Sequence, residues 1–169
     1  MLNSTKSFAA LAALLALTVA TTAEARQGSF RVRGANGAVA GATGARGTAV
    51  RGHGVTTTAD GSTTRVSGGA FRGTNGSAGY RASATTANPD GSVTHAGQAA
   101  ASGPRGSAAS SGSVTRAADG TWSGGRSTTA TNAATGNNYS GSTTIDPATG
   151  KPVHSGTCTD ASGAVISCR

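Results

Sequence analysis

The chain has 169 residues, with 14 Lys and Arg against six Asp and Glu, so its formal net charge is +8. Every Leu and the only Met lie within the first 17 residues, and beyond Ala25 only nine Val and two Ile supply large aliphatic side chains, whereas the chain contains 27 Gly. This composition excludes a helical bundle, an α/β enzyme domain and, beyond that first stretch, a transmembrane segment. Low apolar content with positive charge is also typical of disorder, so a largely disordered chain is one alternative.

Residues 1–25 are predicted to be a secretory signal peptide. Lys6 precedes an apolar run over 8–20, and a small-x-small triplet ends at Ala25. The run of about 13 residues is too short for a bilayer, which needs about 20. We therefore expect cleavage after Ala25 and a mature protein that is secreted, periplasmic or held at the cell surface.

Residues 26–54 are predicted to form a flexible, partly disordered N-terminal arm. The interval is rich in Gly and Arg, and its glycines interrupt every candidate strand without a regular spacing. Phe30 and Val32 alternate with Arg31 and Arg33, so a short strand at this point is the alternative.

Residues 55–169 carry a turn signal about every 15 residues. The pairs Asp60-Gly61, Asp90-Gly91 and Asp119-Gly120 follow one another at intervals of 30 and 29 residues. Asp and Asn hydrogen-bond the local backbone, and Gly accepts the positive φ that a hairpin turn requires. The spacing therefore predicts repetition of one hairpin unit. The full series of turn glycines is Gly61, Gly76, Gly91, Gly106, Gly120, Gly136, Gly150 and Gly163.

The intervals between these turns are rich in Thr, Ser, Val and Ala, which favour extended strands over helices. The predicted fold is an all-β antiparallel hairpin meander with little core, in which 55–169 form the repeated region. A β-solenoid is the alternative, but it would stack Asp60, Asp90 and Asp119 about 5 Å apart, where like charges repel. In a meander these turns lie about 10 Å apart, so we prefer the meander.

Cys158 and Cys168 are the only cysteines, and Gly163 is the midpoint between them. We expect the two thiols to form a disulfide across the last hairpin. Closing a loop of about 11 residues stabilises the fold by about 2.8 kcal/mol in the chain-entropy treatment. An exported protein meets an oxidising compartment, and the spacing fits neither a CxxC redox motif nor a zinc site.

The sequence offers no arrangement of catalytic groups. The three His are 42 and 59 residues apart, and all five Asp beyond Ala25 fall at predicted turns, where their carboxylates cap the backbone. No motif places a Ser nucleophile beside His and Asp, and no oxygen cluster suits a divalent cation. We expect a non-enzymatic protein without metal, cofactor or small-molecule substrate. The residues expected to have a structural role in turns are Asp60, Gly61, Asp90, Gly91, Asp119, Gly120, Gly150 and Gly163.

Arginine supplies 12 of the 13 basic residues beyond Ala25. Its guanidinium binds phosphate, sulfate and carboxylate groups bidentately, so an exported basic chain is expected to adhere to polyanions. The aromatic residues are too few to stack a series of nucleic-acid bases. The candidate polyanion-binding residues are Arg65, Arg72, Arg81, Arg105, Arg116 and Arg126.

Three functional hypotheses follow from these features. The first is an exported structural or interaction protein of the cell envelope or extracellular matrix, which self-associates through strand edges. The second is a monomeric module that binds acidic polysaccharide, lipid phosphate or DNA. The third is an ice-binding surface built from the Thr pairs at Thr57-Thr58, Thr85-Thr86 and Thr143-Thr144. Polyanion binding weakens steeply with salt, whereas pairing between strands changes little.

Overall fold

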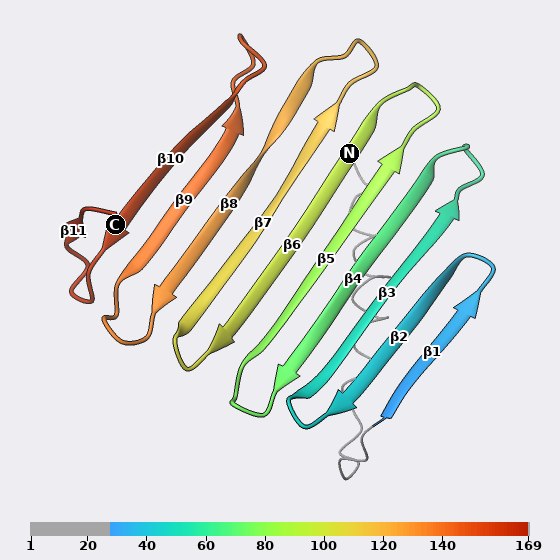
Figure 1. The fold of residues 1–169 in the computed structure, drawn as a ribbon. Coiled ribbons are helices and arrows are strands. Elements are labelled where there is room, and N and C mark those ends of the chain that lie inside the picture. Colours follow the sequence, from blue (N-terminus) through green and yellow to red (C-terminus); the bar gives the residue numbers. More distant parts are fainter. Residues whose placement is uncertain (1–27, 169) are drawn as a thin grey trace.

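The structure, a computed structural model, describes residues 28–168, and the predicted signal peptide lies outside the described residues. One open sheet contains all eleven strands, each antiparallel to its neighbours in the sequence (Figure 1). The predicted antiparallel meander is confirmed. The strands are β1 (Gly28–Gly34), β2 (Gly37–Gly44), β3 (Gly47–Thr57), β4 (Thr63–Gly73), β5 (Ala78–Ala87), β6 (Val93–Gly103), β7 (Gly106–Arg116), β8 (Trp122–Asn132), β9 (Asn138–Ile145), β10 (Pro152–Thr159) and β11 (Val165–Ile166).

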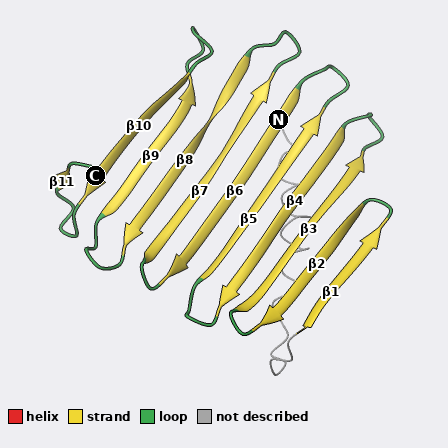
Figure 2. Ribbon diagram, in the orientation of Figure 1, coloured by secondary structure: helices red, strands yellow, loops and turns green. Residues whose placement is uncertain are grey.

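Short turns at both ends of the sheet join the strands (Figure 2). All eight glycines of the predicted turn series have a positive φ, as a hairpin turn requires. In the Asp-Gly turns the carboxylate accepts a hydrogen bond from the backbone N–H two residues further on. The N–O distances are 3.0 Å for Asp60 and Ser62, 2.8 Å for Asp90 and Ser92, and 2.9 Å for Asp119 and Thr121.

These turns are expected to make the fold sensitive to acid. The hydroxyl of Ser92 and its backbone N–H donate to Asp90 and lower the pKa of this carboxyl below its ordinary value. Local donors lower the pKa values of the other four described Asp in the same way. A carboxylate with a lowered folded pKa stabilises the fold above its unfolded pKa, and this contribution is lost as the pH falls through the folded pKa.

We therefore expect the midpoint of thermal unfolding to be highest near neutral pH and to fall below about pH 4. Circular dichroism melts between pH 7 and pH 2 measure this change. The variant Asp90→Asn keeps an acceptor oxygen but does not titrate, so it should lose less stability in acid than the wild type. A midpoint that does not change between pH 7 and pH 2 contradicts the expectation.

Residues 28–54, predicted as part of a flexible arm, instead form β1, β2 and most of β3. The glycines here do not interrupt strands: Gly34 pairs with Gly37, and Gly44 pairs with Gly47, across two-residue turns. The same Gly-x-x-Gly hairpin recurs between β6 and β7. β1 and β2 are shorter than most later strands, so their turns follow each other more closely than the 15-residue spacing.

The sheet is a single layer with almost no core. Among the described residues only Ala82 is a buried apolar side chain, and Phe71, Tyr80 and Trp122 are each more than two-fifths exposed. Extensive contacts join only strands that are adjacent in the sheet. The backbone hydrogen bonds between strands therefore hold the fold together, as the low apolar content predicted. No helix in the described part of the chain is long and apolar enough to cross a membrane.

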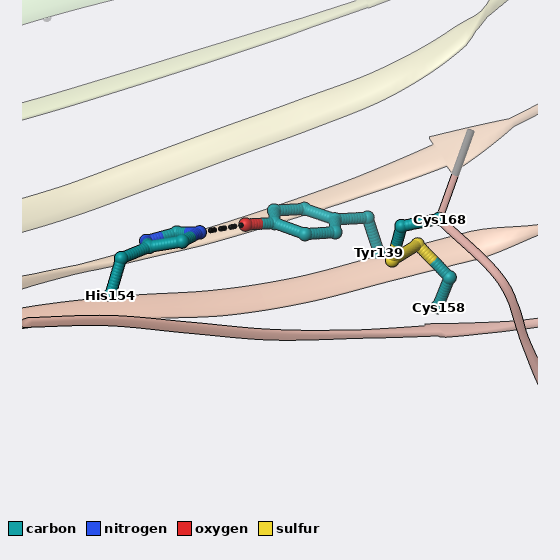
Figure 3. The surroundings of a disulfide bond; sticks show 4 residues. All are labelled: Tyr139, His154, Cys158 and Cys168. Carbon is teal, nitrogen blue, oxygen red and sulfur yellow. Dashed lines mark hydrogen bonds between the residues drawn. A yellow bond between two sulfur atoms is a disulfide. The ribbon is translucent and has the colours of Figure 1, made fainter.

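The last hairpin is closed by the predicted disulfide between Cys158 and Cys168, whose Cα atoms are 5.3 Å apart (Figure 3). Cys158 lies opposite Ile166 in the register, so the hairpin is centred on Ser162, one residue before the predicted centre at Gly163. The chain bends back after β11 to bring Cys168 to its partner. The bridge covalently fixes the β10–β11 end of the sheet.

Candidate functional site

The register divides the strand residues between two faces, because paired residues share a face and successive residues alternate. One face, which we call the arginine face, also carries His53, His95 and His154. Most described arginines lie on this face although they come from six different strands. The arginines of this face are Arg31, Arg33, Arg51, Arg65, Arg81, Arg116 and Arg126.

The opposite, neutral face carries one charged residue among the described strands, Arg72. Arg46, Arg105 and Lys151 lie in turns, as do all five described Asp. No carboxylate of the described chain therefore lies on either face of the sheet. The positive charge of the arginine face is not neutralised by acidic side chains beside it.

Three side chains on the arginine face form an arginine row perpendicular to the strands. Arg31 is separated from Arg51 by Ala40, and Arg51 from Arg81 by Gly69. Neighbouring strands are about 4.8 Å apart, so successive arginines of the row start about 10 Å from one another. The small residues between them leave the guanidinium groups accessible from the solvent.

Two adjoining depressions, of about 490 Å³ and about 370 Å³, lie along the arginine face. The larger is lined by Arg51, Phe71 and Arg81, and the smaller by His95 and residues of β7 and β9. Both are lined by Ser110 and Arg126. We call the combined depression, which runs across the strands from β3 to β9, the trough.

Arg126 is fixed where the two parts of the trough meet. Its Nε donates a hydrogen bond of 2.5 Å to the hydroxyl of Ser110 on β7, and this hydroxyl donates to the backbone carbonyl of Ser127 at 2.9 Å. Among the described residues, Nε is the only nitrogen of this guanidinium with a hydrogen-bond partner. Its terminal nitrogens are thus available to an anion in the trough.

Two histidines of the arginine face are paired with threonines on neighbouring strands. The Oγ1 of Thr85 lies 2.8 Å from Nδ1 of His95, and the Oγ1 of Thr143 lies 3.0 Å from Nδ1 of His154. Figure 3 shows the Tyr139 hydroxyl meeting the other ring nitrogen of His154, at 3.1 Å. These hydrogen bonds orient the two rings along the face. No group of three metal-binding side chains occurs in the described part of the chain.

Four of the six candidate arginines lie together on the arginine face: Arg65, Arg81, Arg116 and Arg126. Arg72 lies on the neutral face, and Arg105 lies in the turn between β6 and β7. Sequence reasoning missed Arg31, Arg33 and Arg51 because it assigned them to a flexible arm. The positions of the turn centres could have identified these arginines. The turns set the register, and the register determines on which face each strand residue lies.

The neutral face has two halves of different chemistry. Over β1–β6 it carries Phe, Val, Tyr and Ala, and over β7–β10 it carries mainly Ser and Thr. The hydroxyls of Ser142 and Ser155 lie 2.9 Å apart across β9 and β10. Thr85 and Thr86 point to opposite faces, because adjacent strand residues alternate. The Thr pairs therefore do not make one array.

Comparison with known proteins gives no assignment for this arrangement. No protein-family model, curated protein or solved structure matches the chain. The function is therefore inferred from the charge, shape and chemistry of the two faces.

Proposed function

We propose that the protein is an exported, non-enzymatic module that binds polyanions through its arginine face. The observation that carries this proposal is the segregation of charge: seven arginines share one face, and every described carboxylate lies in a turn. Arginine binds carboxylate, sulfate and phosphate with two parallel hydrogen bonds. An array of such groups attracts a polyanion and holds it at several points.

The shape of the face favours an acidic polysaccharide over the other polyanions. A linear chain lying in the trough crosses the strands and meets Arg51, Arg81 and Arg126 in turn. The spacing of about 10 Å within the arginine row suits acidic groups that recur regularly along a polymer. Phe71 and the alanines of β6 and β7 provide an apolar surface against which sugar rings can pack. Stacked bases would need a series of aromatic side chains, which the trough does not contain.

The two other hypotheses receive less support. Arg31 and Arg33 charge the first strand, and Pro152 begins β10, which the short β11 covers in part. Charges, proline and short covering strands are devices that natural sheets use against pairing at their edges. The hydroxyl half of the neutral face contains more Ser than Thr. This composition differs from the Thr array on which the ice-binding hypothesis was based.

The direct test is binding to dextran sulfate, with uncharged dextran as the matched control polymer. We expect dextran sulfate to bind and dextran not to bind. Contacts with six or more anionic groups predict a loss of affinity of about a thousandfold between 50 and 200 mM salt. Equal binding to both polymers, or affinity that does not change with salt, would overturn the proposal.

A second test fills the trough without changing charge. Gly97 lines the trough, and a Cβ atom added there meets Ala82 O at 3.5 Å and Ser83 Cβ at 3.7 Å, which are ordinary contacts. We expect Gly97→Val to fold and to weaken dextran sulfate binding about tenfold, which corresponds to about 1.4 kcal/mol. The control Ala96→Val places the same side chain on the neutral face of the same strand. If both variants weaken binding equally, the trough is not the binding site.

A further inference from the structure

The β1–β6 half of the neutral face exposes large apolar side chains that nothing in the described chain covers. Phe30 is 50% exposed, Val32 63% and Tyr80 43%. We call this surface the apolar patch. It comprises Phe30, Val32, Val39, Val50, Val66 and Tyr80, with alanines between them on β4, β5 and β6.

The patch is bordered by polar residues. Thr56, Thr64, Thr86 and Thr94 run along one side, and the hydroxyls of Thr64 and Thr86 lie 2.9 Å apart. On the other side Arg72 lies one residue before the end of β4, where its long side chain reaches solvent. An apolar centre within a polar border is the anatomy of a protein interface.

We propose that a second copy of this chain covers the apolar patch, so that two sheets pack face to face in a symmetric dimer. A two-fold interface must be complementary to itself, since each copy contributes the same surface. The patch meets this condition because its centre is uncharged. The exposed ring of Tyr80 lies on the same surface as the hollows over Gly52 and Gly68, which have no side chains. Each copy therefore offers both a projection and a recess.

The patch and its polar border together are large enough for a stable dimer. Three apolar side-chain rows lie between the two border rows, so the surface spans six strands about 4.8 Å apart and five rows about 6.7 Å apart. It covers about 29 by 33 Å, or about 950 Å² on each copy. Specific interfaces commonly bury about 800 Å² on each partner, with their polar rim included.

The distribution of charge favours packing through the apolar patch over packing through the arginine faces. Packing the two arginine faces together would bring seven guanidinium groups of each copy into one interface without a described carboxylate between them. Stacking through the apolar patch leaves both arginine faces on the outside. Sheets that pack in this way lie about 10 Å apart, and their side chains form a shared core. The dimer thereby supplies the core that the single sheet lacks.

Sedimentation velocity of the full chain tests the proposal, in 500 mM salt to suppress polyanion contaminants. We expect a dimer at about 10 μM, since interfaces of this size usually have dissociation constants in the micromolar range or below. Ala100→Glu sets a carboxylate in the patch and should leave a monomer at the same concentration. Ser140→Glu is the matched control, because Ser140 lies in the same side-chain row on β9, within the hydroxyl half. This variant should remain dimeric.

Circular dichroism first establishes that each variant keeps its strands. If Ala100→Glu does not fold, Tyr80→Gln replaces it, with an expected increase of at least tenfold in the dissociation constant. A monomeric wild type at 100 μM overturns the proposal, and so does a dimer that neither patch variant weakens. A wild type that stays monomeric but binds vesicles of neutral phosphatidylcholine assigns the patch to a lipid surface instead, which also overturns it.

Discussion

Replacing Arg51, Arg81 and Arg126 together with Gln is expected to weaken binding to dextran sulfate about a hundredfold at 50 mM salt, if each contact contributes about 1 kcal/mol. These three arginines line the larger part of the trough. Each neutralised anionic group contributes about 0.7 to 0.9 to the slope of log affinity against log salt. The variant should therefore also flatten this slope by about two to three units, which titrations at several salt concentrations measure.

The matched control variant removes three positive charges that lie outside the arginine face. Arg46 and Arg105 lie in hairpin turns, and Arg72 lies on the neutral face. The control variant with these three residues changed to Gln has the same net charge as the trough variant. It should retain most of the affinity and most of the salt slope. Equal losses in the two variants would show that net charge, not the arginine face, determines binding.

Gly106→Ala is expected to destabilise the fold by about 3 kcal/mol or more, and Gly91→Ala by about 1 to 2 kcal/mol. Gly106 begins β7 with a φ of +138°, and a Cβ atom added to it would overlap the backbone carbonyl of Thr131 on β8. Gly91 has a φ of +85°, but a Cβ atom there meets nothing within 4 Å. The first substitution therefore adds a backbone clash to the conformational strain that both share.

Urea unfolding followed by circular dichroism measures the two free energies, and Trp122 fluorescence gives a second probe. His95→Gln serves as the control, because this exposed ring has one hydrogen bond, to Thr85, and lies outside the turns. It should change the free energy of unfolding by less than about 1 kcal/mol. If Gly91→Ala lowers the free energy of unfolding more than Gly106→Ala does, contact with the backbone of β8 does not determine the cost of a side chain at position 106.

The fold was largely predictable because local chemistry determines a meander. Asp60-Gly61 and its repeats specify turns at a fixed interval, and strands between consecutive turns must pair as neighbours. Of the first three strands, only β1 was considered, as an alternative short strand at Phe30 and Val32. The turns that join them, at Ala35-Asn36 and Ala45-Arg46, lack the Asp-Gly signal and follow each other after ten residues. Glycines on both sides of a two-residue turn resemble a flexible linker when they are read one at a time.

The candidate site was predicted only in part, because the face of a strand residue depends on register. Arg65 and Arg72 are seven residues apart on one strand, and this odd separation places them on opposite faces. Counting arginines along the chain cannot separate such pairs. The trough was beyond sequence reasoning, since it depends on small residues from several strands that align only when the whole register is known.

The neighbour-only contacts of this sheet have a mechanical consequence. Each strand is bonded only to the strands beside it, so the fold is a one-dimensional array whose stability is a sum over adjacent pairs. Tension along the chain acts on one hairpin at a time and peels strands from an edge in sequence. The disulfide joins β10 to the segment after β11, and β10 is held to β9 by hydrogen bonds alone. Under tension the sheet is therefore expected to yield at its edges and to lengthen in small steps, one strand at a time.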